Sequence, residues 1–138
     1  MTEEEIAQRV AKGLEFHQRN FNCAQCVACA TCYLADMDFE TTFLLMEALG
    51  KGLGDATQVC GAVSGGCAVV GASMSNGSEL CNSKMRVYAE VAPMRMAFAD
   101  QFGSSTCEDI RPTENSGNPG ACNDYIAAMI EMVCRKLE

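Results

Sequence analysis

Apolar residues recur every three or four positions along most of this chain, and strict alternation of apolar and polar residues is nearly absent. This period is typical of amphipathic α-helices, because about 3.6 residues complete one helical turn. In residues 3–19, Thr2 and Glu5 form a capping box ahead of an apolar stripe. The stripe consists of Ile6, Val10, Leu14, His17 and Phe21. The pattern predicts an all-α fold in which residues 1–138 form a single domain, a compact bundle of about five to six helices.

Start and stop signals divide the remaining sequence into further expected helices. They cover residues 23–35, 38–49, 55–73, 79–102, a short helix opening at residues 105–108, and 118–137. The 55–73 helix should open with Asp55 and Gln58 as a capping box and form the glycine-rich centre of the bundle. Each glycine lowers helix propensity by about 1 kcal/mol relative to alanine. We therefore expect the glycines of this helix to allow close packing of its neighbours.

The charge balance excludes several classes of partner. Eighteen acidic residues against ten lysines and arginines give a net charge of −8, which repels nucleic-acid phosphates and anionic lipid headgroups. No apolar run approaches the roughly 18 residues needed to cross a bilayer. The acidic start of the chain is the opposite of a secretory leader, so the sequence predicts a cytoplasmic protein without nucleic-acid binding or membrane insertion.

Ten cysteines set this composition apart from that of most chains. In a small secreted protein they would indicate a disulfide framework. This chain is larger and has helix-patterned segments that can form a core without crosslinks. We therefore expect reduced thiols, some of them metal ligands or redox centres.

Four cysteines fall close to expected helix starts. Cys23 and Cys107 are the first and second residues of their helices, Cys122 is third or fourth in the last helix, and Cys60 is about fifth in the glycine-rich one. Unpaired backbone N–H groups and the helix dipole stabilise anions at such positions, which lowers the pKa of a thiol there. The thiolate is both the nucleophile and the metal ligand. These four cysteines are the predicted working residues.

The remaining cysteines carry weaker predictions. Cys23, Cys26, Cys29 and Cys32 repeat at every third residue, but bacterial ferredoxins use a different final spacing followed by proline. In a helix each step rotates the side chain by about 300°, so the four cannot all face one cluster and only neighbours such as Cys23 and Cys26 can share a site. Buried packing is the simpler interpretation of Cys67, Cys81 and Cys134.

Two further residues remain second-rank ligand candidates. His17, the only histidine, lies on the apolar stripe, where a packed or dipole-compensating role is more common than metal binding. Cys67 shares a helix face with Cys60, but seven helical residues span about 10.5 Å, too far for a disulfide or a shared metal ion. Any partner of Cys60 must come from another helix.

The segments Phe21-Asn22-Cys23-Ala24-Gln25 and Cys60-Gly61-Ala62-Val63-Ser64-Gly65, followed by Cys107 and Cys122, resemble the C_GCAxxG_C_C family of redox-active proteins. The family signature has four cysteines around a C-G-A-x-x-G core. A second match, Gly66 to Gly71 around Cys67, fits the letters of the family name, but we favour Cys60 for its place near a helix start. The resemblance implies a redox role. By similarity to a related module in split-Soret cytochromes, it also implies an iron–sulfur centre and a homodimer.

Three functions remain open at this stage. The first is electron transfer through an iron–sulfur cluster, or alternatively zinc, held by Cys23, Cys60, Cys107 and Cys122. The protein would then be an oxidoreductase component that exchanges electrons with a redox partner protein. The second is metal-free thiol–disulfide exchange, with Cys23 and Cys60 as the candidate reactive thiols. The third is a helical interaction protein whose cysteines only pack.

Overall fold

A computed structural model describes residues 1–112 and 121–138. It confirms the all-α fold, with seven α-helices and no strand in this part of the chain. The helices are α1 (Glu3–Gln18), α2 (Cys23–Thr31), α3 (Phe39–Met46), α4 (Gly61–Met74), α5 (Lys84–Phe102), α6 (Cys107–Ile110) and α7 (Ala121–Leu137). Short 3-10 turns, Cys32–Ala35 and Glu47–Leu49, extend α2 and α3 close to their expected ends.

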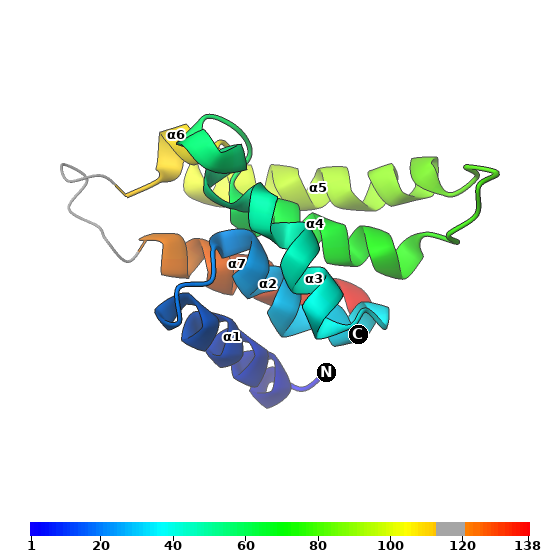
Figure 1. The fold of residues 1–138 in the computed structure, drawn as a ribbon, viewed down its shortest axis with the longest axis horizontal. Coiled ribbons are helices and arrows are strands. Elements are labelled where there is room, and N and C mark those ends of the chain that lie inside the picture. The colour runs from blue at the N-terminus through cyan, green and yellow to red at the C-terminus, as the bar shows by residue number, and fades with distance from the viewer. Residues whose placement is uncertain (113–120) are drawn as a thin grey trace.

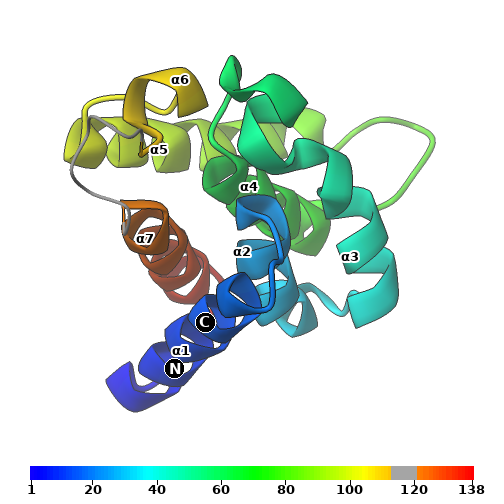
Figure 2. The same ribbon diagram turned by 60° about the vertical axis from the view of Figure 1, so that its left-hand side comes forward.

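Helix α2 forms the centre of the bundle, with α1, α3, α4 and α7 packed around it (Figure 1 and Figure 2). Every residue from Ala24 to Thr31 is buried. Capping boxes open the first two helices: the predicted one of Thr2 with Glu5 for α1, and a second one of Asn22 with Gln25 for α2. The largest fully buried side chains come mainly from α2, α4, α5 and α7: Val27, Val63, Val69, Val70, Phe98, Ile126, Met129, Ile130 and Val133.

Two glycines of α4 allow this helix to lie directly against α2. A Cβ atom at Gly65 would be 2.5 Å from the carbonyl oxygen and 3.0 Å from the Cα atom of Ala24. A Cβ atom at Gly61 would be 3.2 Å from the backbone nitrogen of Ala24. Backbone atoms cannot move aside as the end of a flexible side chain can, so the Gly65 position requires glycine and the Gly61 position leaves little room for a side chain. This close approach places the first residues of α4 next to the first residues of α2.

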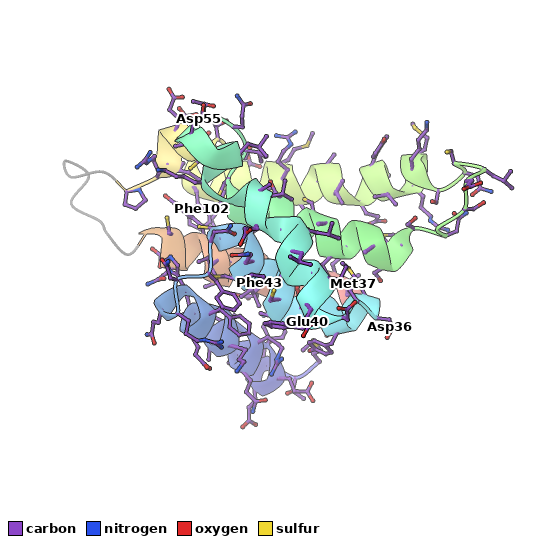
Figure 3. All side chains as sticks on the ribbon, in the orientation of Figure 1. Asp36, Met37, Glu40, Phe43, Asp55 and Phe102 are labelled. Carbon is purple, nitrogen blue, oxygen red and sulfur yellow. The ribbon has the colours of Figure 1, made fainter. Side chains whose placement is uncertain are left out.

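The predicted start of the glycine-rich helix is wrong. α4 begins at Gly61, and the preceding residues form a separate π-type turn, Gly52–Ala56, in which Leu53 and Ala56 have positive φ angles. Asp55 caps the turn locally by accepting hydrogen bonds from the backbone N–H and hydroxyl of Thr57, and it lies on the outside of the molecule (Figure 3). Cys60 is therefore the N-cap residue of α4 rather than its fifth residue.

The predicted starts of the last three helices differ from the structure or lie outside the described residues. α5 begins at Lys84 rather than Glu79, because residues 79–83 form a turn with Cys81 at positive φ. α6 has Thr106 as its N-cap without a side-chain hydrogen bond, so the expected box opening at Ser105 is not formed and Cys107 is the first residue of the helix. The predicted start of the last helix at Asn118 and Pro119 lies outside the described residues.

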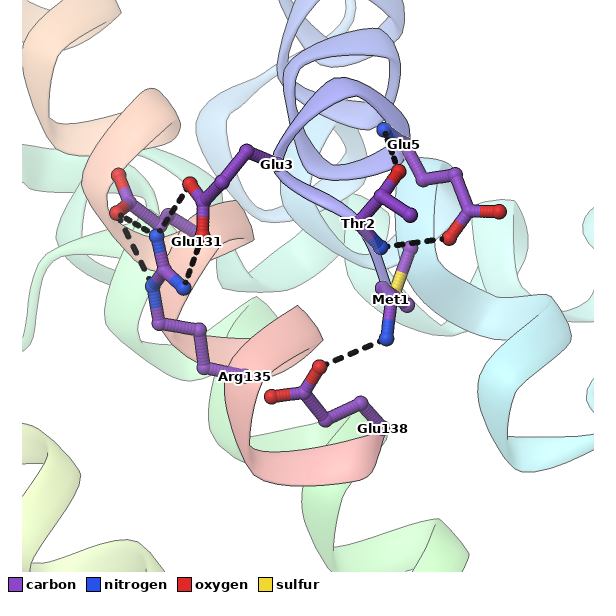
Figure 4. Close-up of polar contacts among 7 residues, drawn as sticks. All are labelled: Met1, Thr2, Glu3, Glu5, Glu131, Arg135 and Glu138. Carbon is purple, nitrogen blue, oxygen red and sulfur yellow. Dashed lines mark hydrogen bonds and ion pairs between the residues drawn. The ribbon is translucent and has the colours of Figure 1, made fainter.

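The two ends of the chain meet where α1 begins and α7 ends (Figure 4). Both guanidinium NH2 groups of Arg135 donate to the Glu3 carboxylate at 2.9 Å, and the N-terminal amine of Met1 pairs with Glu138 at 2.7 Å. Surface pairs of this kind contribute about 0–1 kcal/mol each, so they align the helix ends more than they stabilise the fold. Within the described residues, no helix is long and apolar enough to cross a membrane.

Candidate functional site

All four cysteines predicted from the sequence line one cavity of about 330 Å³. Cys23 comes from the start of α2, Cys60 from the N-cap of α4, Cys107 from the start of α6 and Cys122 from the start of α7. We call this space the sulfur cavity. The rest of its described lining is His17, Asn20, Phe21, Asn22, Lys51, Gly61, Ile110, Arg111, Pro112 and Tyr125.

A short backbone pairing holds Cys60 and Cys107 together. Val59 and Thr106 form an isolated antiparallel bridge, in which the Cys60 N–H donates to Ser105 at 2.7 Å and the Cys107 N–H donates to Gln58 at 2.8 Å. Because side chains alternate along extended backbone, Cys60 and Cys107 lie on the same side of this bridge. Each cysteine then leads directly into a helix.

The turn before the bridge supports the same arrangement. Gly52 has φ of 54°, and a Cβ atom there would be 2.7 Å from the Cβ atom of Cys107. This residue combines a left-handed backbone with close packing, which only glycine provides without strain. Tyr125 of α7 also supports α6, since its hydroxyl donates to the carbonyl of Ile110 at 2.7 Å.

Cys23 and Cys122 interact directly within the cavity. The Cys23 thiol donates a hydrogen bond to the sulfur of Cys122. This hydrogen bond and, to a smaller extent, the charge of Arg111 lower the pKa of Cys122 to about 7, against the effect of burial. The same hydrogen bond, together with burial, raises the pKa of Cys23 well above its ordinary value. Of these two residues, Cys122 is therefore the more acidic thiol and Cys23 the less acidic one.

The sequence predicts that all four helix starts lower the pKa of the thiol. This prediction is wrong for Cys60 and Cys107, as it is for Cys23. Burial raises the pKa of Cys60 to about 11, although the backbone N–H groups of Ala62 and Val63 donate to its sulfur and oppose this shift. Burial also raises the pKa of Cys107, against the charges of Arg111 and Lys51. The cost of removing a thiolate from water exceeds the stabilisation by the helix terminus at these sites.

Most of the remaining cysteines are separate from the sulfur cavity. Cys26, Cys29, Cys32 and Cys134 are buried in the helical core, and Cys81 is exposed on the turn before α5. Cys26 donates to the carbonyl of Phe21 instead of sharing a site with Cys23. Cys67 faces α5, 3.9 Å from the Val91 carbonyl oxygen. The structure thus separates the two matches to the family motif, because Cys60 lines the cavity and Cys67 does not.

The structure adds residues to the site that the sequence pattern did not single out. These residues are Lys51, Arg111 and Tyr125. No sequence motif marks them, because they come from distant segments of the chain that meet only in the folded structure. His17, a second-rank candidate, does line the cavity, and its Nδ1 lies 2.6 Å from the Asn123 Oδ1, which connects the end of α1 with the start of α7.

The four cysteines are suitable ligands for a metal–sulfur group, but their spacing restricts which group they can hold. Four thiols from four elements face one space, and sulfur ligands favour iron–sulfur clusters and zinc. Among residues 1–112 and 121–138, however, no three His, Cys, Asp or Glu side chains lie close enough together to hold a single metal ion. Tetrahedral zinc with bonds of about 2.3 Å needs sulfurs about 3.8 Å apart. A cluster contains several iron and sulfide atoms, so its ligands lie farther apart.

A comparison with curated proteins and with solved structures finds no match. A family model matches residues 21–136, and its description is "Putative redox-active protein (C_GCAxxG_C_C)". The match spans most of the chain and includes all four cysteines of the sulfur cavity. The chain therefore belongs to the C_GCAxxG_C_C family of redox-active proteins.

Proposed function

We propose that this protein transfers electrons through an iron–sulfur cluster held by Cys23, Cys60, Cys107 and Cys122. The observation that carries the proposal is the convergence of these four thiols, from four separate elements, on one cavity. A function that used only one thiol pair would leave the other two cysteines without a role. When bound, a cluster supplies one-electron chemistry at a potential that the surrounding charges and hydrogen bonds set.

The residues around the thiols provide what such a centre needs from the protein. The backbone N–H groups of Ala62 and Val63 donate to the Cys60 sulfur, and hydrogen bonds to sulfur stabilise the thiolate form. Arg111 and Lys51 offset the negative charge that four thiolates bring into the cavity. Tyr125 and Phe21 contribute apolar surface that limits access of water.

The cluster is preferred to zinc because of the spacing of the side chains. Cys23 and Cys122 are in contact, but among the described residues no three possible ligands are grouped tightly enough for one ion, whereas a larger group can bridge ligands that lie farther apart. The choice of these four among ten cysteines is supported by the positions of the other six, none of which lines the cavity.

The proposal predicts the composition of protein purified under anaerobic conditions. Iron and acid-labile sulfide should be present in similar, stoichiometric amounts, with visible absorption that is lost on reduction. Zinc should stay at background. Protein that contains neither iron nor sulfide, after purification from cells supplied with iron, would contradict the cluster.

Thiol–disulfide exchange is a second candidate, and the hydrogen bond between Cys23 and Cys122 favours it. The Cys122 thiolate would attack a substrate disulfide, forming a mixed disulfide and releasing one thiol. Cys23 would then attack the Cys122 sulfur, closing a Cys23–Cys122 disulfide and releasing the second thiol. The substrate disulfide gains the two electrons and two protons that the cysteine pair loses.

The same preparation distinguishes the two candidates. Metal-free protein that reversibly loses two free thiols on treatment with a disulfide, mapped by mass spectrometry to Cys23 and Cys122, would support exchange. Protein that contains no metal and shows no reversible loss of thiols would contradict both candidate functions.

A further inference from the structure

The charges in the sulfur cavity are opposite in sign to the charge of the whole protein. The net charge is −8, yet the described residues that line the cavity include Lys51 and Arg111 and no aspartate or glutamate. The two cations come from different segments, the turn after α3 and the residue after α6. Both influence the thiols, since Arg111 acts on Cys107 and Cys122 and Lys51 acts on Cys107.

The backbone of Lys51 has a conformation that costs conformational free energy. Lys51 has φ of 52° and ψ of 45°, the left-handed region that residues with a side chain rarely adopt. A non-glycine residue held there costs about 1–3 kcal/mol, and such conformations are concentrated at functional sites. Gly52, the next residue, also has a positive φ angle of 54° and adopts that region without this cost. The chain nevertheless places a long cationic side chain at the cavity wall.

The cavity also has the polar groups and the size that a small molecule needs. Its volume is about 330 Å³, within the range of small-molecule sites. Asn20 lines it as well, and its side-chain amide can donate hydrogen bonds to anionic oxygen or nitrogen atoms.

From these observations we propose that the sulfur cavity binds a small multivalent anion at Lys51 and Arg111, and that such anions are the substrate class of the redox centre. The assignment rests on the proposed redox function. Charge-assisted contacts from a guanidinium and an ammonium group hold the anion beside the sulfurs. Electron transfer to the anion then requires neither a new bond nor a proton: the centre loses one electron and the anion gains it.

The test uses two small oxidants of opposite charge on the full-length protein purified under anaerobic conditions and reduced. Ferricyanide is a trianion and hexaammineruthenium(III) is a trication. If the net charge controlled encounter, added salt would speed the reaction with ferricyanide, because it would screen a repulsion. The proposal predicts the reverse: salt slows ferricyanide and speeds hexaammineruthenium(III). Salt effects of the sign set by the net charge would overturn it.

Matched variants locate the effect. Lys51→Gln and Arg111→Gln should each lower the ratio of the ferricyanide rate to the hexaammineruthenium(III) rate by about threefold to tenfold, whatever they do to the redox centre itself. Lys84→Gln removes the same charge from an exposed residue at the start of α5, outside the lining of the cavity, and should change neither rate by more than about twofold. Equal effects of Lys51→Gln and Lys84→Gln would contradict a local anion site.

A binding measurement separates this inference from the redox function. Hexacyanocobaltate(III) has the charge and shape of ferricyanide but does not accept electrons under these conditions. Backbone amide shifts near Lys51 and Arg111 should change on its addition in the wild type and not in the Lys51→Gln/Arg111→Gln double variant. Binding without any oxidation by ferricyanide would contradict the proposed function alone, and oxidation without binding would contradict the anion site alone.

Discussion

Gly65→Ala is expected to destabilise the protein by about 1–3 kcal/mol, although alanine is the better helix former. The new Cβ atom would be 2.5 Å from the Ala24 carbonyl oxygen, and the backbone of α2 cannot yield without moving the helix. Moving α4 away from α2 would also move Cys60 away from Cys23, because these residues are at the adjoining starts of the two helices. The free energy of unfolding in urea and the iron content should therefore decrease together.

Gly71→Ala is the matched control on the same helix. A Cβ atom there would meet only the Val87 Cγ1, at an ordinary contact distance of 3.4 Å. The gain in helix propensity should leave this variant as stable as the wild type or more stable by up to about 1 kcal/mol, with normal iron content. Equal stability changes for the two variants would show that the α2–α4 contact does not determine the position of the site.

Cys60→Ser is expected to abolish the visible absorption of the purified protein and most of its bound iron, whereas Cys67→Ser should preserve both. The two cysteines are on one helix and each fits a version of the family motif. The structure distinguishes them, because Cys60 lines the sulfur cavity beside the other three thiols and Cys67 faces the α5 backbone. Serine keeps the side-chain size but is a poor ligand for iron in a sulfur site.

A measurement of secondary structure shows whether loss of iron comes from unfolding of the variant rather than from loss of a ligand. Both variants should remain helical by circular dichroism, since a serine replaces a sulfur without leaving a cavity. Loss of iron in Cys67→Ser, or retention of iron in Cys60→Ser, would reverse the assignment of the two motif matches.

The sequence was sufficient to predict the helical fold and to select the four cysteines that line the sulfur cavity, whereas their role as ligands stays a prediction. Periodicity identified α1, α2, α3 and the end of α5 within a few residues, because these helices have capping side chains or a terminal glycine close in sequence. Cys23 was placed correctly as the first residue of α2. The predicted redox partner protein, homodimer and cytoplasmic location stay predictions.

Other features depend on contacts between distant segments, which periodicity does not register. The turn at Gly52–Ala56 resembles a helix start in composition, and only its positive φ angles separate it from α4. Lys51 and Arg111 become neighbours of the thiols through the pairing of residues 58–60 with 105–107. The pKa shifts followed burial more than position along a helix, and burial is a property of the assembled bundle.

Anomalous diffraction at the iron absorption edge, from crystals of anaerobically purified protein, tests most directly whether the four cysteines form one redox centre. We predict a single strong peak within the sulfur cavity, bonded to the sulfurs of Cys23, Cys60, Cys107 and Cys122. A peak beside Cys26, Cys29 and Cys32 instead, or no iron peak in the cavity, would contradict the account.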